Sequence, residues 1–236
     1  SARFSESLRA YFPQLVVEKR LRWDDVATEV DIAFLCGECL YLIECKHSLT
    51  ATDPHEMRDL WRDIRKGVSQ IQRGMSILQV AERRRTFLKA WFRELEVDQI
   101  DCLRICGAVL SSHRLFSGLD LEGVAIRDYA SLTRLVDNGT IGMGTPMEDG
   151  TIVMKVFRIR EASELGCADI ANYFSPDSKI HRFHAHSMVG QHTFQQFGPL
   201  TIVRESFAYQ IDPDDWTDYM EHQGYVRLPD QIITQA

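Results

Sequence analysis

Two apolar runs separated by Gly37-Glu38 constrain the fold of this chain more than any other segment. Residues 28–36 and 39–46 are rich in Val, Ile, Phe, Leu and Tyr. Glycine at the first position of a two-residue loop is typical of a type II′ turn, which joins two antiparallel strands into a β-hairpin. In that register Cys36 lies opposite Cys39, and counting outward places Asp31 opposite Glu44 and Glu29 opposite Lys46.

The same register gathers charge on a face that is otherwise apolar. Side chains alternate along a strand, so Glu29 and Asp31 share a face with Glu44 and Lys46. Like charges that face each other destabilise a sheet unless a cation neutralises them. Mg²⁺ is typically held by one or two carboxylates, with waters and phosphate oxygens. The hairpin therefore predicts a metal site at Asp31 and Glu44, with Lys46 close enough to orient or deprotonate a water.

This arrangement resembles the PD-(D/E)XK superfamily, the restriction-endonuclease-like nucleases. The matching residues are Asp31 and the tripeptide Glu44-Cys45-Lys46. The resemblance implies that Asp31 and Glu44 bind Mg²⁺, with Mn²⁺ as a substitute, and that Lys46 positions the attacking water. Val30 stands where many members carry a proline. The alternative is an ordinary hairpin whose charges lie on a solvated face.

A predicted helix over residues 54–78 adds a second element to the resemblance. Gly67 and Gly74 are seven residues apart and lie on one helix face, which Gln70 shares. Glycines let a backbone approach another element closely, so we expect this face to pack on the sheet with Gln70 directed at the site. Several branches of the superfamily, among them the nuclease-related and type IV restriction-like groups, carry a glutamine here, which implies a catalytic role for Gln70. A surface glutamine is the alternative.

Basic residues gather in this helical part, although the whole chain carries a net charge of −7. Residues 55–94 contain ten basic and five acidic side chains, whereas residues 199–236 contain two basic and seven acidic ones. A basic helix beside a metal site suits a phosphate backbone. A solvated face with intrahelical ion pairs explains the same residues equally well. The candidate nucleic-acid-binding residues are Arg58, Arg62, Lys66 and Arg73.

The six cysteines do not have the spacing of a secreted disulfide framework. They lie in apolar contexts, so we expect reduced thiols in a cytoplasmic protein. Cys36 and Cys39 have the C-x₂-C spacing of a zinc site, which Cys102 and Cys106 would complete. Buried thiols that act as small hydrophobic side chains explain all of them equally well.

The order of the predicted elements defines the expected fold class. A helix at residues 4–12 and a strand at 15–21 precede the hairpin. After the helix at 54–78 we expect a helix at 80–95, strands at 103–110 and 124–126, and a helix to residue 136 capped by Asp128. This order predicts an α/β fold, with a mixed β-sheet flanked by helices, and matches the restriction-endonuclease-like core over residues 1–137. The glycines after Asn138 mark a boundary or a long loop.

Residues 151–236 are expected to form a β-rich C-terminal region of unknown role, with a helix near residues 162–174. Strands are predicted at 151–159, 180–189, 193–197 and 200–210. His184 and His186 would share a strand face, as metal ligands or as part of a polar outer face. Asp212-Pro213-Asp214-Asp215 is interpreted as a turn or a helix start. Glu6 on the first helix is a minor candidate for the metal site.

These residues together predict a Mg²⁺-dependent endonuclease that hydrolyses phosphodiester bonds in nucleic acid, with DNA expected before RNA. The resemblance implies products with 5′-phosphate ends and a role in defence against foreign DNA. Two alternatives are a catalytically idle nuclease-like module for binding or assembly, and an interaction domain stabilised by zinc. No apolar run is long enough to span a bilayer, and no signal peptide is visible. A homodimer and a further domain outside this sequence, which does not begin with Met, are left open.

Overall fold

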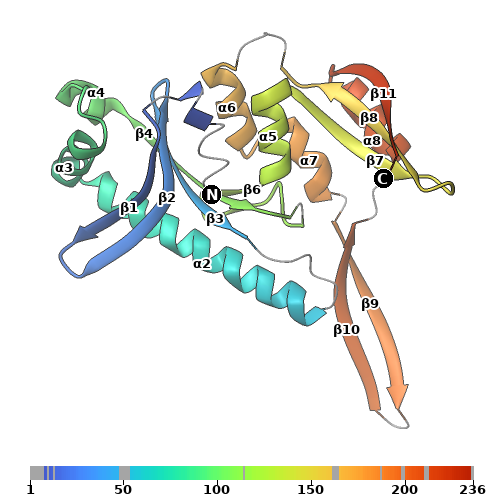
Figure 1. Ribbon diagram of the computed structural model, residues 1–236. Coiled ribbons are helices and arrows are strands. Elements are labelled where there is room, and N and C mark those ends of the chain that lie inside the picture. The colour runs from blue at the N-terminus through green and yellow to red at the C-terminus, as the bar shows by residue number, and fades with distance from the viewer. Residues whose placement is uncertain are drawn as a thin grey trace.

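The computed structural model describes residues 8–9, 11–12, 14–47, 54–113, 115–160, 165–186, 188–197, 200–209 and 213–234. A six-stranded mixed sheet in the order β1-β2-β3-β4-β6-β5 forms its centre, with helices on both faces (Figure 1). Its strands are β1 (Val16–Trp23), β2 (Val26–Cys36), β3 (Cys39–Lys46), β4 (Arg104–Ser111), β5 (Asp120–Leu121) and β6 (Val124–Asp128). The predicted fold class, a mixed sheet flanked by helices, is confirmed.

The hairpin of β2 and β3 has the predicted register. Cys36 pairs with Cys39, and the ladder continues outward to Ile32 and Ile43. Gly37 has a φ of +59°, as the first residue of a type II′ turn requires. β1 pairs antiparallel with β2, whereas β3, β4 and β6 run parallel. The carboxyl ends of β3, β4 and β6 therefore meet at one edge of the sheet.

Helix α2 (Pro54–Gln79) lies across one face of this sheet (Figure 1). Gly67 and Gly74 both face the sheet, because a Cβ at Gly67 would meet Lys46 and a Cβ at Gly74 would meet Leu21. Val68 and Ile71 join Leu21, Leu40, Leu42 and Val109 in the core on this side. The packing face predicted from the two glycines is therefore correct. Helices α3 (Ala81–Trp91) and α4 (Val97–Cys102) follow at one end of α2.

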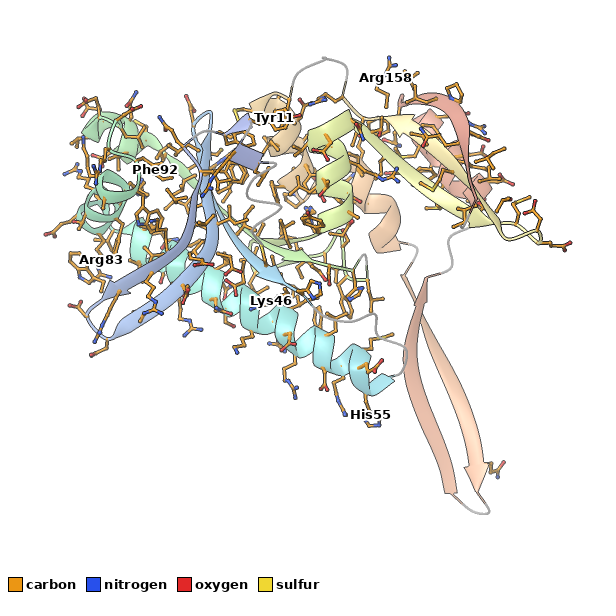
Figure 2. The ribbon with its side chains drawn as sticks, in the orientation of Figure 1. Tyr11, Lys46, His55, Arg83, Phe92 and Arg158 are labelled. Atoms are coloured by element: carbon orange, nitrogen blue, oxygen red, sulfur yellow. A yellow bond between two sulfur atoms is a disulfide. The ribbon has the colours of Figure 1, made fainter. Side chains whose placement is uncertain are left out.

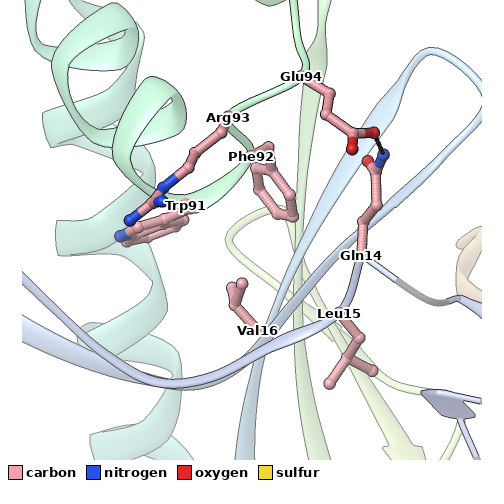
Figure 3. A pocket seen from close by; sticks show the side chains of 7 residues that line it. All are labelled: Gln14, Leu15, Val16, Trp91, Phe92, Arg93 and Glu94. Carbon is pink, nitrogen blue, oxygen red and sulfur yellow. Dashed lines mark hydrogen bonds between the residues drawn. The ribbon is translucent and has the colours of Figure 1, made fainter.

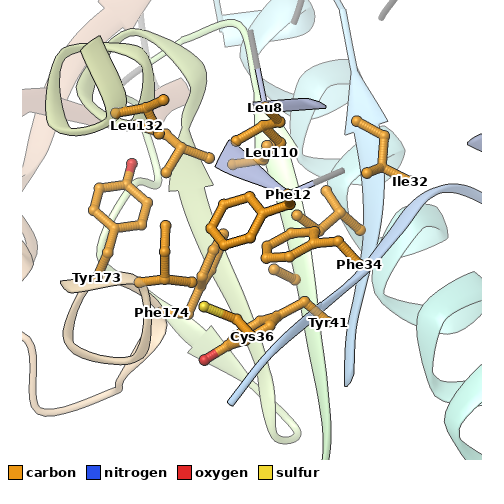
Figure 4. Close-up of a cluster of buried hydrophobic side chains, with 14 of the residues drawn as sticks. Leu8, Phe12, Ile32, Phe34, Cys36, Tyr41, Leu110, Leu132, Tyr173 and Phe174 are labelled. Atoms are coloured by element: carbon orange, nitrogen blue, oxygen red, sulfur yellow. The ribbon is translucent and has the colours of Figure 1, made fainter. Parts of the chain in front are cut away.

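Aromatic side chains dominate the core on the opposite face, which α5 (Tyr129–Asn138) and α6 (Cys167–Phe174) cover (Figure 4). Phe34 stacks against Phe12 and against Tyr41, with ring centroids 4.7 and 5.1 Å apart. Tyr41 in turn contacts Phe174 of α6 at 5.3 Å. Asp128 caps α5 as predicted, because its side chain accepts a hydrogen bond from the main-chain N–H of Ser131. Residues beyond 137 thus complete the core of the first sheet.

A disulfide joins Cys36 at the end of β2 to Cys167, the first residue of α6. The expectation that all cysteines are reduced is therefore wrong for this pair. It failed because the two residues are 131 positions apart in the chain, and only the packing of α6 on the sheet brings them together. The proposed zinc set is not assembled either. Cys36 is part of the disulfide and Cys102 is exposed on α4.

The C-terminal region forms two further sheets (Figure 1). Strands β7 (Thr140–Pro146), β8 (Thr151–Arg158) and β11 (Val226–Thr234) form an antiparallel sheet in the order β11-β8-β7. Helix α8 (Pro213–His222) packs on it, with Trp216 edge-on to Phe157 at 5.1 Å. Strands β9 (Met188–Phe197) and β10 (Leu200–Tyr209) form a hairpin that projects from the body.

Parts of this region differ from the prediction. Residues 180–186 belong to helix α7 (Lys179–His186), so His184 and His186 do not share a strand face. Ile180 is buried with Trp216 and Met220, and this packing outweighs the local alternation. The segment after Asn138 is a strand and not a long loop, because side chains from β8 fill the space beside its glycines. Glu6 lies outside the described residues. None of the described helices is long and apolar enough to cross a membrane.

Candidate active site

The predicted site residues meet at the carboxyl end of β3. Figure 2 labels one of them, Lys46, beside the middle of α2. Lys46 Nζ donates hydrogen bonds to Glu44 Oε1 at 2.6 Å and to Gln70 Oε1 at 3.0 Å. The hydroxyl of Thr28 donates to the main-chain oxygen of Gln70 at 2.9 Å, which ties α2 to β2. Three of the four residues expected to act in catalysis therefore form one hydrogen-bonded group.

Asp31 joins this group at the point where β2 and β3 separate. The two strands pair as far as Ile32 and Ile43, and Asp31 lies one residue beyond. Its Oδ2 accepts a hydrogen bond of 2.7 Å from the main-chain N–H of Cys45, in place of a main-chain carbonyl. The carboxylate of Asp31 is thereby held near Glu44, although the paired ladder ends one residue before the predicted Asp31–Glu44 pair.

Glu44 is the most enclosed charged group of the site. Its side chain is 6% exposed, compared with 18% for Lys46. Burial raises the pKa of the Glu44 carboxyl and the charge of Asp31 raises it further, while Lys46 and Gln70 oppose this shift. Oε2 of Glu44 is buried and accepts no hydrogen bond from the described residues. A buried acceptor without a partner costs about 1–3 kcal/mol, so the site favours a ligand that supplies positive charge.

The donor set of this site fits a hard divalent cation. Asp31 and Glu44 offer carboxylate oxygens, and the orphaned Oε2 of Glu44 is one of them. In the described parts of the chain no group of three or more His, Cys, Asp and Glu residues is placed to hold a metal. Mg²⁺ commonly uses only one or two protein carboxylates and completes its shell with water and phosphate oxygens. Solvent and substrate would therefore supply the remaining ligands.

Gly67 determines how closely α2 approaches the site. A Cβ at this position would lie 2.9 Å from Lys46 Cε, 3.2 Å from Val109 Cγ2 and 3.4 Å from Glu44 Cγ. The stem of Lys46 and the body of Glu44 thus fill the space that any larger residue would need. The sequence predicted only a packing role for this glycine, whereas the structure makes it a wall of the site.

Glu29 does not face Lys46, contrary to the expectation from the hairpin register. It pairs with Arg20 of β1 and forms an ion pair with it at 3.6 Å. The reason is that β2 and β3 separate beyond Ile32, so the neighbour available to Glu29 is on β1.

Polar residues at the end of β4 lie beside the site and were not predicted. Ser111 is opposite Lys46 in the parallel register, and the N–H of Ser112 donates to the main-chain oxygen of Lys46 at 3.0 Å. The N–H of His113 donates to the hydroxyl of Ser111 at 3.1 Å. The sequence does contain a signal for these residues, because polar residues directly follow a buried strand here, and ligands bind at the carboxyl ends of parallel strands.

The candidate nucleic-acid-binding residues form an exposed row along α2. Arg58, Arg62, Lys66 and Arg73 are all exposed. At about 100° per residue, the three arginines lie within about 60° of one another on the helix. Lys66 lies between them and Gln70. The basic row therefore borders the site along the helix.

Other basic residues counted in this segment serve the fold. Arg84 donates to the main-chain oxygens of Leu78 at 2.7 Å and Asp101 at 3.0 Å, which joins the end of α2 to α4. Arg85 forms an ion pair with the side chain of Asp101. Arg83 lies 5.3 Å from the ring centre of Trp23. The positive charge available to a ligand is thus concentrated nearer the site than the sequence count indicates.

Two cavities among the described residues lie away from this site. One of about 310 Å³ is bounded by Gln14, Trp91 and Phe92 between the start of β1 and the end of α3 (Figure 3). Another of about 740 Å³ lies on the sheet face opposite α2, where Tyr41 and Arg104 line it. Neither of these two cavities is lined by a predicted site residue.

Comparisons of the chain with protein-family models, with curated proteins and with solved structures found no match. The resemblance to the PD-(D/E)XK nucleases therefore rests on Asp31, Glu44, Lys46 and Gln70 and on the way they are arranged.

Proposed function

We propose that this protein is a Mg²⁺-dependent nuclease that hydrolyses phosphodiester bonds, with DNA as the preferred substrate. The observation that carries the proposal is the hydrogen-bonded group of Glu44, Lys46 and Gln70 beside Asp31. This group stands at the strand ends, next to an exposed basic row on α2. Action on foreign DNA in the cytoplasm belongs to the same proposal.

Lys46 has the central role in the proposed reaction. Its ammonium group has three donors, and two of them are used by Glu44 and Gln70. The third can hold the attacking water or a phosphate oxygen. Glu44 and Gln70 hold the ammonium group in place before the substrate binds, so the reaction loses no entropy in positioning it. A divalent cation bound by Asp31 and Glu44 would neutralise charge on the scissile phosphate and lower the pKa of a water.

A purely structural ion pair between Glu44 and Lys46 is the competing explanation. Buried pairs stabilise a fold only when hydrogen bonds satisfy their remaining polar atoms. Here Oε2 of Glu44 has no such partner among the described residues, and Asp31 adds a like charge beside it. Both features cost stability in a structural pair, and both are expected of a cation site.

The test is incubation of the protein with plasmid, single-stranded DNA and RNA in the presence of Mg²⁺, Mn²⁺ or EDTA. Asp31→Asn and Glu44→Gln remove charge while keeping shape, and asparagine at 31 retains an acceptor for the N–H of Cys45. Both variants should stay folded and lose cleavage, and EDTA should abolish it in the parent. Cleavage by either variant at saturating Mg²⁺, or cleavage that survives EDTA, would overturn the proposal.

A further inference from the structure

A thiol lies directly beside a disulfide on the sheet face away from the candidate active site. Cys36, which is bonded to Cys167, pairs across the hairpin with Cys39. Cys36 and Cys39 are both buried in the aromatic core of that face. Cys39 is a free thiol. The disulfide therefore has an internal sulfur nucleophile next to it.

Cys36 has two partners within bonding reach. Its Cα lies 5.2 Å from that of Cys167. Residues directly opposite in an antiparallel pair have Cα atoms about 4.5–5.5 Å apart, and Cys39 occupies that position. Disulfides span Cα separations of about 4.4–6.8 Å, so either pairing satisfies the covalent geometry.

Positive charge lies against both sulfurs that become anionic during an exchange. Arg104 Nη2 donates a hydrogen bond of 3.1 Å to Cys39 Sγ. Cys167 is the first residue of α6, where the partial positive charge of the helix N-terminus favours an anion. Cys106 also lies beside Cys39, but burial raises the pKa of its thiol to about 11, which keeps it protonated. Cys39 is the thiol that lies directly opposite Cys36 in the hairpin, and this position places it for attack on the disulfide.

We propose that Cys39 and the Cys36–Cys167 disulfide form an intramolecular thiol–disulfide exchange site. The thiolate of Cys39 attacks Sγ of Cys36, and a Cys36–Cys39 bond forms as the Cys36–Cys167 bond breaks. The electron pair leaves on Cys167, which takes up the proton that Cys39 released. The exchange consumes no external oxidant or reductant. It does not depend on the proposed nuclease function.

The exchange changes what holds the C-terminal region to the sheet. In one isomer α6 is linked covalently to the end of β2, and in the other the hairpin is closed on itself and α6 is not linked. Non-covalent contacts then hold α6, among them those of Tyr173 and Phe174 in the core. Phe174 and Asn172 of α6 also line the cavity of about 740 Å³, so release of the link would alter that cavity.

Trypsin distinguishes the two isomers. Cys36, Cys39 and Cys45 all fall within the peptide 23–46, where fragmentation in the mass spectrometer identifies the bonded pair, whereas Cys167 falls within the peptide 161–179. The Cys36–Cys167 bond joins the two peptides, and exchange separates them. The oxidised full-length protein is incubated without oxidant between about pH 6 and pH 8, quenched with acid, alkylated and analysed by mass spectrometry. We expect separated peptides with a Cys36–Cys39 bond and alkylated Cys167.

Matched variants isolate the exchange. Cys39→Ser should keep the two peptides joined at every pH, and Cys167→Ser should form the Cys36–Cys39 bond in a glutathione redox buffer. Cys102→Ser, which changes an exposed cysteine on α4, should behave as the parent. The proposal is overturned if the parent stays fully joined at every pH, or if Cys167→Ser leaves Cys36 and Cys39 as thiols. Stoichiometric zinc on reduced thiols would overturn it as well.

Discussion

Replacing Gly67 by alanine inserts a methyl group between α2 and the candidate active site, and Gly74→Ala is its matched control. Both glycines lie inside the same helix, on the same face, seven residues apart. Alanine stabilises a helix interior by about 1 kcal/mol relative to glycine, and this gain is common to both variants. The difference between the two variants therefore reports the contacts of the added methyl group.

The contacts of the added methyl group differ between Gly67 and Gly74, and this difference sets the expected change in stability of each variant. At Gly67 the nearest atom to the new Cβ would be Lys46 Cε at 2.9 Å, which forces a movement, whereas at Gly74 it is Leu21 Cδ1 at 3.3 Å. Overpacking costs about 1–3 kcal/mol. Gly74→Ala should therefore gain up to about 1 kcal/mol, and Gly67→Ala should fall between no change and a loss of about 2 kcal/mol. Each kcal/mol corresponds to about 2–4 °C in Tm for a chain of this size.

Activity should separate the variants more strongly than stability. Lys46 would absorb most of the strain, and its hydrogen bonds to Glu44 and Gln70 would be displaced. A misplacement of about 1 Å can lower a rate by about 10²-fold. We expect Gly67→Ala to cleave plasmid about 10–100-fold more slowly with Mg²⁺, and Gly74→Ala to match the parent. Equal cleavage rates for the two variants would refute the idea that the approach of α2 holds Lys46. A lower Tm for Gly74→Ala than for Gly67→Ala would refute the packing argument.

Four further predictions follow from the contacts described. The pKa of the Glu44 carboxyl is higher in the folded protein than in the unfolded chain, so the folded protein binds the carboxyl proton more tightly. Proton binding at Glu44 therefore stabilises the folded protein at low pH, and this stabilisation is lost as the pH rises above the pKa of the unfolded chain, about 4.3. Glu44→Gln should therefore gain Tm over the metal-free parent as pH increases, and a pH-independent difference would contradict this. Lys46→Met should lose about 10²–10⁴-fold in cleavage while calorimetry still detects Mn²⁺ binding, whereas loss of both would indicate a structural role. Joint replacement of Arg58 and Arg62 by alanine should flatten the salt dependence of duplex binding, measured with Ca²⁺, by up to about two units, and an unchanged slope would move the phosphate contacts elsewhere. Arg127→Met should cost at least about 3 kcal/mol in urea unfolding, because the buried guanidinium donates to five main-chain carbonyls, and a cost below about 1 kcal/mol would rule out that role.

Local sequence specified the elements that build the site. The turn at Gly37 set the register that pairs the hairpin as far as Ile32 and Ile43. Asp31 follows one residue further and is held by the main-chain N–H of Cys45. The spacing of Gly67 and Gly74 identified the buried face of α2, and Gln70 followed from it. Each of these depends on neighbours within one turn or one hairpin, where turn chemistry and periodicity act directly.

The remaining features depend on contacts that no local pattern contains. Helix α7 is decided by the burial of Ile180 against residues of α8, more than thirty positions later in the chain. Glu29 forms its ion pair with Arg20 of β1 because β2 and β3 separate beyond Ile32, before they reach Glu29. The disulfide partner of Cys36 is set by how α6 packs. The charge count along the chain likewise included Arg84, which binds main-chain carbonyls at a helix junction.

Helix α2 is one uninterrupted element of 26 residues, and under the proposed function this makes it a molecular ruler. Arg58 and Gln70 are twelve residues apart on it, which is about 18 Å along the axis at about 1.5 Å per residue. A duplex that followed the basic row would advance about five base pairs over that length, at about 3.4 Å per base pair. The phosphate contacts of Arg58 and the bond to be cleaved would then be separated by about half a helical turn of DNA. Because one helix carries both the phosphate contacts and the site, the distance between them would not change with loop movements. The segment of DNA protected by the protein would therefore extend to one side of the cleaved bond by a constant length.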